Sequence, residues 1–155
     1  MRIALCIALL TALAGAALAA EIPLDQRRSG YSFMSPDTRA MQDEDTANPG
    51  MLSVLDGEAL WKRKAGTADK ACADCHSDAR VTMKGIAARY PAFEKALGRP
   101  VDLEGRINLC RANHQQASPF AYESRELLAL TAYVAQQSRG EPIAAGDDPA
   151  LTPFV

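Results

Sequence analysis

The stretch CADCH, from Cys72 to His76, constrains this chain more than any other part of its sequence. Two cysteines separated by two residues and followed at once by a histidine form the C-x-x-C-H pattern of c-type haem attachment. Thiols at this spacing reach the two vinyl groups of haem, and the adjacent histidine then lies under the iron as its proximal ligand. The sequence therefore predicts one covalently attached haem c, held by Cys72 and Cys75, with His76 on the iron.

The cysteine count fits this prediction once the N-terminus is taken into account. Residues 1–20, MRIALCIALLTALAGAALAA, combine a basic residue, a short apolar run and a small-residue cleavage site, as secretory signal peptides do. A retained anchor is the alternative, but the apolar run is short for a membrane core. Cys6, one of four cysteines, leaves with this leader. We therefore expect a periplasmic protein with three cysteines, which cannot all pair as disulfides within one chain.

Three other interpretations of the motif compete with haem attachment. A thioredoxin-like redox pair needs a strand before it and a helix after it, and no such strand is evident. A structural zinc site of Cys72, Cys75, His76 and Cys110 has suitable ligand types, although adjacent Cys75 and His76 make tetrahedral ligation awkward. A chance match without any cofactor is the third interpretation, and export with an odd cysteine count disfavours it.

The first half of the sequence after the leader predicts two helices. Residues 35–37, Ser-Pro-Asp, supply an N-cap, a proline at the first helical position and an acid in the first turn. This helix should run to about Asp45, before a turn at residues 48–50. Asp56 is predicted to cap the next helix, which should fade near residues 64–66.

The second half predicts further helices, and the fold class is therefore all-α with long loops. Short helical segments are expected at residues 85–97 and 102–110, and the clearest helix spans residues 123–138. No alternating apolar pattern predicts a strand, and the Pro-rich tail from residue 141 should be extended. The apolar face of the last helix contains Leu127, Leu128, Leu130, Thr131, Tyr133, Val134 and Gln137.

The helices that flank the motif favour a class I cytochrome c-like domain. Gly57 and Trp61 precede the motif by one loop, and Leu130 and Tyr133 lie on the last helix. Gly57 would allow these two helices to cross closely. The formal net charge of −2 gives no indication of nucleic-acid binding, and no second stretch has the length of a membrane span. We expect a signal peptide (1–20), an N-terminal extension (21–50), a haem domain (51–140) and a linker or tail (141–155).

Three side chains after the motif could bind the iron from its distal side: Met83, Cys110 and His114. Met83 follows the motif closely and is better explained by apolar packing, and His114 by a solvated position. Cys110 is balanced between an iron ligand and a free buried thiol, because buried cysteine is common but an unpaired thiol is a liability after export. A thiolate ligand would lower the reduction potential relative to methionine. Arg106 or Arg111 could supply a compensating positive charge.

Six segments of the sequence are distinctive: MSPDTRAMQDEDTANPG, GEALW, CADCH, RYPAFE, GRINLCR and ELLALTAYVAQQSRGEPI. Together they resemble the SoxA family, the larger cytochrome subunits of the periplasmic SoxAX complexes of thiosulfate oxidation. The C-x-x-C-H motif alone would not single out this family, whereas the first of these segments and INLCR are much more specific. The resemblance covers essentially the whole sequence after the leader.

The resemblance implies a set of site residues and partners. In dihaem members of this family the N-terminal haem is bound by C-x-x-C-H with a distal cysteine, and the matching positions are Cys72, Cys75, His76 and Cys110. SoxAX joins thiosulfate oxidatively to a cysteine of the carrier SoxYZ, an L-cysteine S-thiosulfotransferase activity. The implied partners are therefore a SoxX-like cytochrome subunit and a SoxYZ-like carrier. The family places the sulfur chemistry in a second haem domain, whose motif this sequence lacks, so no residue here is predicted to be catalytic.

Two further functions stay open at this point. The chain could be a stand-alone periplasmic electron carrier with one haem and no substrate of its own. It could also be a docking module whose haem mainly stabilises the fold. A second C-x-x-C-H in frame beyond Val155 would favour the SoxA-type subunit, and a haem that physiological reductants do not reduce would favour the docking module.

Overall fold

Residues 21–144 and 149–154 are described by a computed structural model, so the predicted signal peptide, residues 1–20, lies outside the described residues. The chain divides into two compact units, Met1–Ala40 and Met41–Val155. None of the helices in the described ranges is long and apolar enough to cross a membrane.

The first unit contains short helical segments. The 3-10 turns η1 (Leu24–Gln26) and η2 (Gly30–Phe33) precede helix α2 (Pro36–Asp43), which begins in this unit. The Ser35 hydroxyl accepts a hydrogen bond from the Thr38 backbone N–H at 3.2 Å. The predicted start of this helix is therefore confirmed, and its end lies close to the predicted one.

Two long helices, α3 (Met51–Lys62) and α7 (Arg125–Gln136), pack directly on each other in the second unit. A Cβ atom on Gly57 would lie only 2.1 Å from the carbonyl oxygen of Ala129 and 2.6 Å from the Cβ of Tyr133. Only a residue without a side chain fits at this crossing. The predicted close approach of the two helices at Gly57 is confirmed.

The start of α3 differs from the prediction. The helix begins at Met51, directly after a turn in which the Gly50 N–H donates to Asn48 Oδ1 at 2.8 Å. Asp56 lies inside the helix, where its carboxylate pairs with Arg125 of α7 at 2.7 Å, so its predicted role as a cap is wrong. Apolar side chains such as Leu52 point to solvent, so no single apolar face marks where α3 begins.

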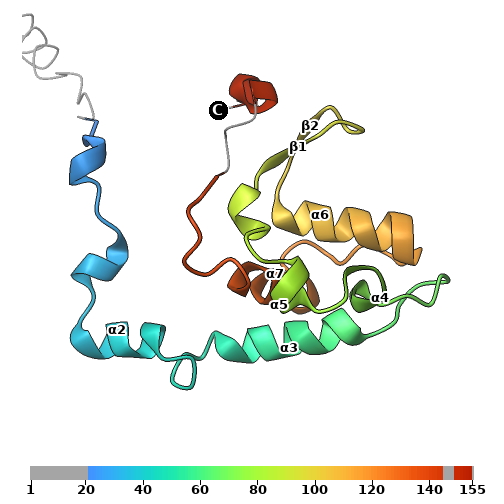
Figure 1. Ribbon diagram of the computed structural model, residues 1–155, viewed down its shortest axis with the longest axis horizontal. Helices are drawn as coiled ribbons and strands as arrows, with labels where there is room; N and C mark the ends of the chain where they lie inside the picture. The colour runs from blue at the N-terminus through green and yellow to red at the C-terminus, as the bar shows by residue number, and fades with distance from the viewer. Residues whose placement is uncertain (1–20, 145–148, 155) are drawn as a thin grey trace, which may run out of the picture. The chain divides into compact units, whose positions relative to one another are not determined.

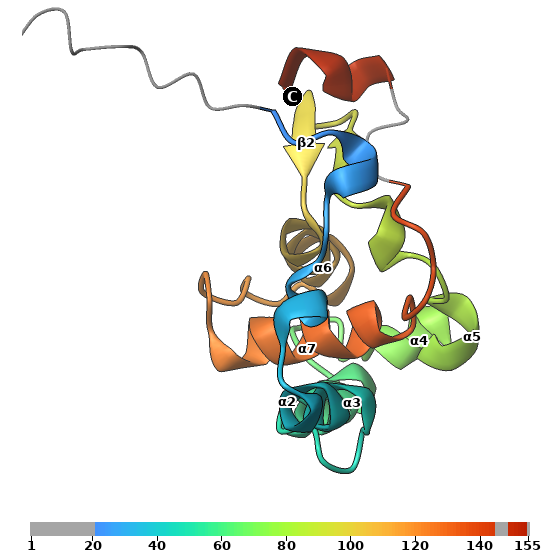
Figure 2. The same ribbon diagram turned by 90° about the vertical axis from the view of Figure 1, so that its left-hand side faces the viewer.

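The core of the second unit lies between α3, α7 and the segment after the motif. It contains Trp61, Ala79, Leu130, Tyr133 and Val134. The predicted apolar face of α7 is too wide, because Leu128 is 45% exposed. Figure 2 shows α7 lying between α3 and helix α6 (Leu103–Cys110), so both faces of α7 are covered.

The segment between the motif and α7 is less helical than the sequence predicts. Helix α6 is confirmed, with the Asp102 carboxylate accepting from the Gly105 N–H at 2.7 Å as its N-cap, and it continues into one π-helical turn, η4 (Arg111–Gln115). The helix predicted over residues 85–97 is wrong. The described residues there form a 3-10 turn, η3 (Ala87–Arg89), and the first strand of a hairpin.

The hairpin pairs strands β1 (Ala92–Glu94) and β2 (Arg99–Val101) in antiparallel register, and both strands are visible in Figure 1. Each strand has three residues, too few for an alternating apolar pattern to show in the sequence. The prediction of an extended tail is wrong for its last described stretch, because η5 (Pro149–Phe154) is a 3-10 helix, whereas residues 141–144 form no helix. Leu151 in η5 is 3% exposed, and the Phe154 ring lies 6.1 Å from that of Phe93 in β1.

Candidate haem site

The CADCH segment forms the short helix α4 (Cys72–His76), and its own residues fix that conformation. The Asp74 carboxylate accepts a hydrogen bond from the Ala71 backbone N–H at 2.8 Å and closes the first turn. The spacing of Cys72 and Cys75 puts both thiols on one side of the helix. The helix ends after the histidine because Ser77 has φ 56° and ψ −136°, outside the helical region.

Two hydrogen bonds hold the backbone at the end of α4. The Thr82 hydroxyl, in helix α5 (Ala79–Thr82), donates to the His76 carbonyl at 2.5 Å, and the Trp61 indole N–H donates to the Ser77 carbonyl at 3.0 Å. The Trp61 ring also lies against the His76 imidazole, with 5.8 Å between their centroids. Trp61 thereby links the packing of α3 on α7 to the orientation of His76.

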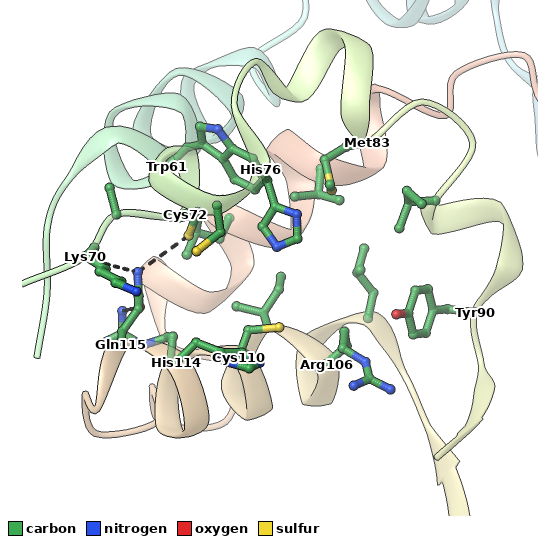
Figure 3. Close-up of a pocket in the computed structure, with 18 residues that line it drawn as sticks. Trp61, Lys70, Cys72, His76, Met83, Tyr90, Arg106, Cys110, His114 and Gln115 are labelled. Atoms are coloured by element: carbon green, nitrogen blue, oxygen red, sulfur yellow. Dashed lines mark hydrogen bonds between the residues drawn. The ribbon is translucent and has the colours of Figure 1, made fainter. Parts of the chain in front are cut away.

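A cavity of about 440 Å³ lies between α4, α6 and α7. This volume is within the range of ligand and cofactor pockets, roughly 300–1,000 Å³. Figure 3 shows the labelled polar side chains arranged around it. The apolar part of its wall includes Ile86, Leu103, Ile107, Leu130 and Val134. A mostly apolar, open-sided cavity with thiols at its edge fits a flat, largely apolar macrocycle.

All four residues predicted to hold the haem line this cavity: Cys72, Cys75, His76 and Cys110. The imidazole of His76 enters it from α4, and the sulfur of Cys110 enters it from α6 on the facing wall (Figure 3). Cys72, Cys75 and Cys110 form no disulfide within the described part of the chain. The fold therefore brings a thiol far along the sequence opposite the histidine of the motif.

The two other candidate distal ligands also line the cavity. Met83 packs against the core cluster and lies on the same side of the cavity as His76 in Figure 3. His114 lies in the π-helical turn after Cys110 and is exposed. Cys110 is the candidate whose donor atom Figure 3 shows facing His76.

Burial disfavours the ionised form of two cysteine thiols in the cavity, and one arginine beside each of them opposes this effect. Burial raises the pKa of the Cys72 thiol, and nearby Arg111 opposes this effect. Burial likewise raises the pKa of the Cys110 thiol, with Arg106 opposing it. Arg106 is anchored by an ion pair with Glu94 of β1. The sequence suggested two arginines as charge partners of Cys110. Arg106 lies near the Cys110 thiol, whereas Arg111 lies near the Cys72 thiol.

The competing interpretations of the motif find no support in this geometry. Before α4, the described chain has only an isolated bridge between Ala65 and Lys70, so no strand of a thioredoxin-like βαβ unit leads into the motif. Across residues 21–144 and 149–154, no three His, Cys, Asp or Glu side chains lie close enough to hold a metal ion by themselves. A zinc site made only of protein ligands therefore has no candidate in the described part of the chain.

One buried polar residue of the cavity wall, Gln115, was not predicted from the sequence. Gln115 is 5% exposed, and its side-chain nitrogen lies 3.8 Å from the sulfur of Cys72. Five positions separate Gln115 from Cys110, which corresponds to no repeat of an α-helix. The π-helical turn, which the sequence does not indicate, brings Gln115 to the cavity.

Comparison with known proteins gives one consistent family. Residues 56–143 match the SoxA/TsdA cytochrome c domain family. Two curated relatives, named L-cysteine S-thiosulfotransferase subunit SoxA, come from Pseudaminobacter salicylatoxidans and Rhodovulum sulfidophilum. Each is 38% identical, and the matches cover 78% and 80% of this chain. The crystal structure of SoxXA from P. pantotrophus matches with a TM-score of 0.75 and 25% identity, over 81% of this chain and 47% of that chain.

These matches concern one part of the related proteins, because the chain spans 42% and 43% of the lengths of the two SoxA relatives. The family match begins inside α3 and ends after α7, so it contains the motif, the cavity and Cys110. The expected fold class, a cytochrome c-like all-α domain, is confirmed by this match and by the mainly helical architecture. The chain therefore belongs to the SoxA/TsdA cytochrome c domain family and is a SoxA-like, haem c-binding domain.

Proposed function

We propose that this chain is the haem-bearing domain of a SoxA-type subunit and serves electron transfer in periplasmic thiosulfate oxidation. Cys72 and Cys75 would hold one haem c through thioethers, His76 would be its proximal ligand and Cys110 its distal ligand. When bound, the haem supplies a one-electron redox centre. The leader, residues 1–20, would direct export and be removed, and residues 51–140 would form the haem domain.

The observation that carries this proposal is that His76 and Cys110 face each other across an apolar cavity edged by Cys72 and Cys75 (Figure 3). The walls of this cavity are mostly apolar, which suits a largely apolar macrocycle. Trp61 fixes the backbone beside His76, and Arg106 lies where it can stabilise a negative charge on the Cys110 sulfur. A thiolate in this position favours the oxidised metal, so we expect a low reduction potential.

The relatives supply the wider setting of the proposal. These relatives are named L-cysteine S-thiosulfotransferase subunit SoxA, and the matching crystal structure is of SoxXA. We infer that this chain associates with a SoxX-like cytochrome subunit and serves a SoxYZ-like carrier protein. We assign the sulfur-transfer activity to the assembly and not to any residue of this chain. Size-exclusion chromatography of the haem-loaded chain with a SoxX subunit should give one complex, and separate elution would contradict the inferred association.

Electron paramagnetic resonance of the purified oxidised protein tests the ligand assignment. The wild type should give low-spin signals of a thiolate-ligated haem. Cys110→Ala should lose these signals, because it removes the sulfur opposite His76. His114→Ala and Met83→Leu are matched controls, because both residues line the same cavity, and they should keep the signals. Thiolate signals that survive Cys110→Ala would refute the assignment.

Mass spectrometry of the unfolded protein tests the attachment residues. The wild-type chain should keep the added mass of one haem after denaturation, because thioethers survive unfolding. Cys72→Ala and Cys75→Ala should each keep the haem by a single thioether, and the double variant should lose it on denaturation. A haem that leaves the denatured wild type would show that it is not covalently attached.

A further inference from the structure

Gln115 is the one polar side chain that is buried among the residues that the structure describes, at 5% exposure. A primary amide has two N–H donors and one carbonyl acceptor, and burying them without partners is unfavourable. Burial of this amide therefore requires specific partners. All three of its polar functions have them.

The two N–H donors of the amide point to Lys70 and Cys72, at the start of the haem-attachment motif. Gln115 Nε2 donates to the Lys70 backbone carbonyl at 2.9 Å and to the Cys72 sulfur at 3.8 Å, as the dashed lines in Figure 3 show. The carbonyl oxygen points the other way and accepts from the Arg111 guanidinium at 3.3 Å. These contacts leave one orientation of the amide possible, with its nitrogen toward the sulfur.

The backbone around Gln115 holds the same loop. The Gln115 carbonyl accepts from the Ala68 N–H at 3.2 Å, and the Gln116 carbonyl accepts from the Thr67 N–H at 3.3 Å. A Cβ atom on Gly66 would lie 2.0 Å from the Gln115 carbonyl oxygen, so only glycine allows the loop to come this close. These contacts hold the loop before α4 against the π-helical turn η4, which follows helix α6 with its Cys110.

We propose that Gln115 is a positioning residue that ties the Cys72 edge of the haem to the helix that carries Cys110. The inference rests on the proposed haem site. The sulfur of a thioether has lone pairs and no proton, so it accepts the N–H of Gln115 as well as a thiol does. The amide thereby fixes the attached edge of the haem relative to Cys110, through its contacts with Lys70, Cys72 and Arg111.

Two variants of Gln115 separate this role from a packing role. Gln115→Leu removes the donors and the acceptor. Gln115→Glu keeps the size and the contact with Arg111 but presents a carboxylate, which has no donor at neutral pH, to the Lys70 carbonyl and the Cys72 sulfur. Both variants should therefore weaken the link between Cys72 and α6, although only Gln115→Leu loses the contact with Arg111.

The measurement is the fraction of haem with thiolate low-spin signals in the holoprotein, together with its reduction potential, at temperatures well below unfolding. In both variants the fraction of haem without these signals should rise roughly tenfold, as expected for the loss of one buried hydrogen bond, and the potential should rise with it. Gln116→Asn is the matched control. It removes the contact of Gln116 with Thr67 but keeps a side chain that tolerates the positive φ of 53° there, and its spectrum should match the wild type.

Each alternative outcome decides against the inference in a different way. A wild-type spectrum of Gln115→Leu would show that the amide does not position the haem. A wild-type spectrum of Gln115→Glu would show that only the Arg111 contact matters. An equal change in Gln116→Asn would assign the effect to the whole loop. A wild type that itself lacks thiolate signals would instead refute the proposed ligation by Cys110, and the inference with it.

Discussion

The crossing of α3 and α7 at Gly57 gives the sharpest test of how this fold is held together. Replacing Gly57 by alanine removes a poor helix former from the middle of α3, which by itself should stabilise the helix by about 1 kcal/mol. The new Cβ atom would lie 2.1 Å from the Ala129 carbonyl oxygen, where ordinary contact is 3.4–4 Å. That oxygen is part of the α7 backbone and cannot rotate away, so the two helices must separate.

Separation would loosen the contacts of Trp61 and Tyr133 in the core. Overpacking of this kind costs typically 1–3 kcal/mol, and a clash with backbone should lie at the upper end or beyond. The steric effect therefore exceeds the gain in helix propensity, and we expect Gly57→Ala to lower the free energy of unfolding by about 2 kcal/mol. For a chain of 155 residues this corresponds to a fall in Tm of roughly 4–8 °C.

The assay is thermal and urea unfolding of the haem-loaded protein, followed by far-UV circular dichroism. Gly30→Ala is the control, because a Cβ atom there meets nothing within 4 Å and Gly30 has no positive φ. This control should change the stability by less than about 0.5 kcal/mol. If Gly57→Ala were as stable as the wild type or more stable, the argument from close helix approach would be refuted.

Two further predictions concern Trp61 and Glu94. Trp61→Phe should lower the free energy of unfolding by about 1–3 kcal/mol, because it removes the hydrogen bond to the Ser77 carbonyl and part of a buried ring; unchanged circular dichroism unfolding curves would contradict this. The pKa of Glu94 is lowered from its ordinary 4.5 because the Ala96 N–H and the Arg106 guanidinium donate to its carboxylate. The stability that the ionised carboxylate contributes is complete above pH 4.5 and is lost as the pH falls through the lowered folded-state pKa. Unfolding curves measured in this range should show the wild type losing stability relative to Glu94→Gln, and parallel losses would rule out this role of Glu94.

The missed elements show where sequence patterns stop being informative. Strands β1 and β2 are too short to alternate visibly, and their pairing depends on a turn at Gly98 rather than on composition. The start of α3 was placed too late because apolar side chains such as Leu52 are exposed there. In both cases a local turn decides the element, at Gly98 for the hairpin and at residues 48–50 for α3, and apolar periodicity does not register such turns.

The sequence by itself determined the features that local chemistry controls. CADCH predicts a haem site because the spacing of two thiols and a histidine meets the needs of one cofactor, and the α6 and α7 helices follow from the helical periodicity of their sequences. The family also follows from the sequence, because its segments lie in order along the chain and the match over residues 56–143 confirms it.

Only the tertiary structure decided which side chain faces His76. Spacing left Met83, Cys110 and His114 open, and the packing of α6 on α7 puts the Cys110 sulfur across the cavity. The same packing brings the buried amide of Gln115 to the sulfur of Cys72. The physical reason is that the two walls of the cavity come from helices far apart in sequence. Their relative position is set by a glycine at one helix crossing and a π-helical turn at the end of another.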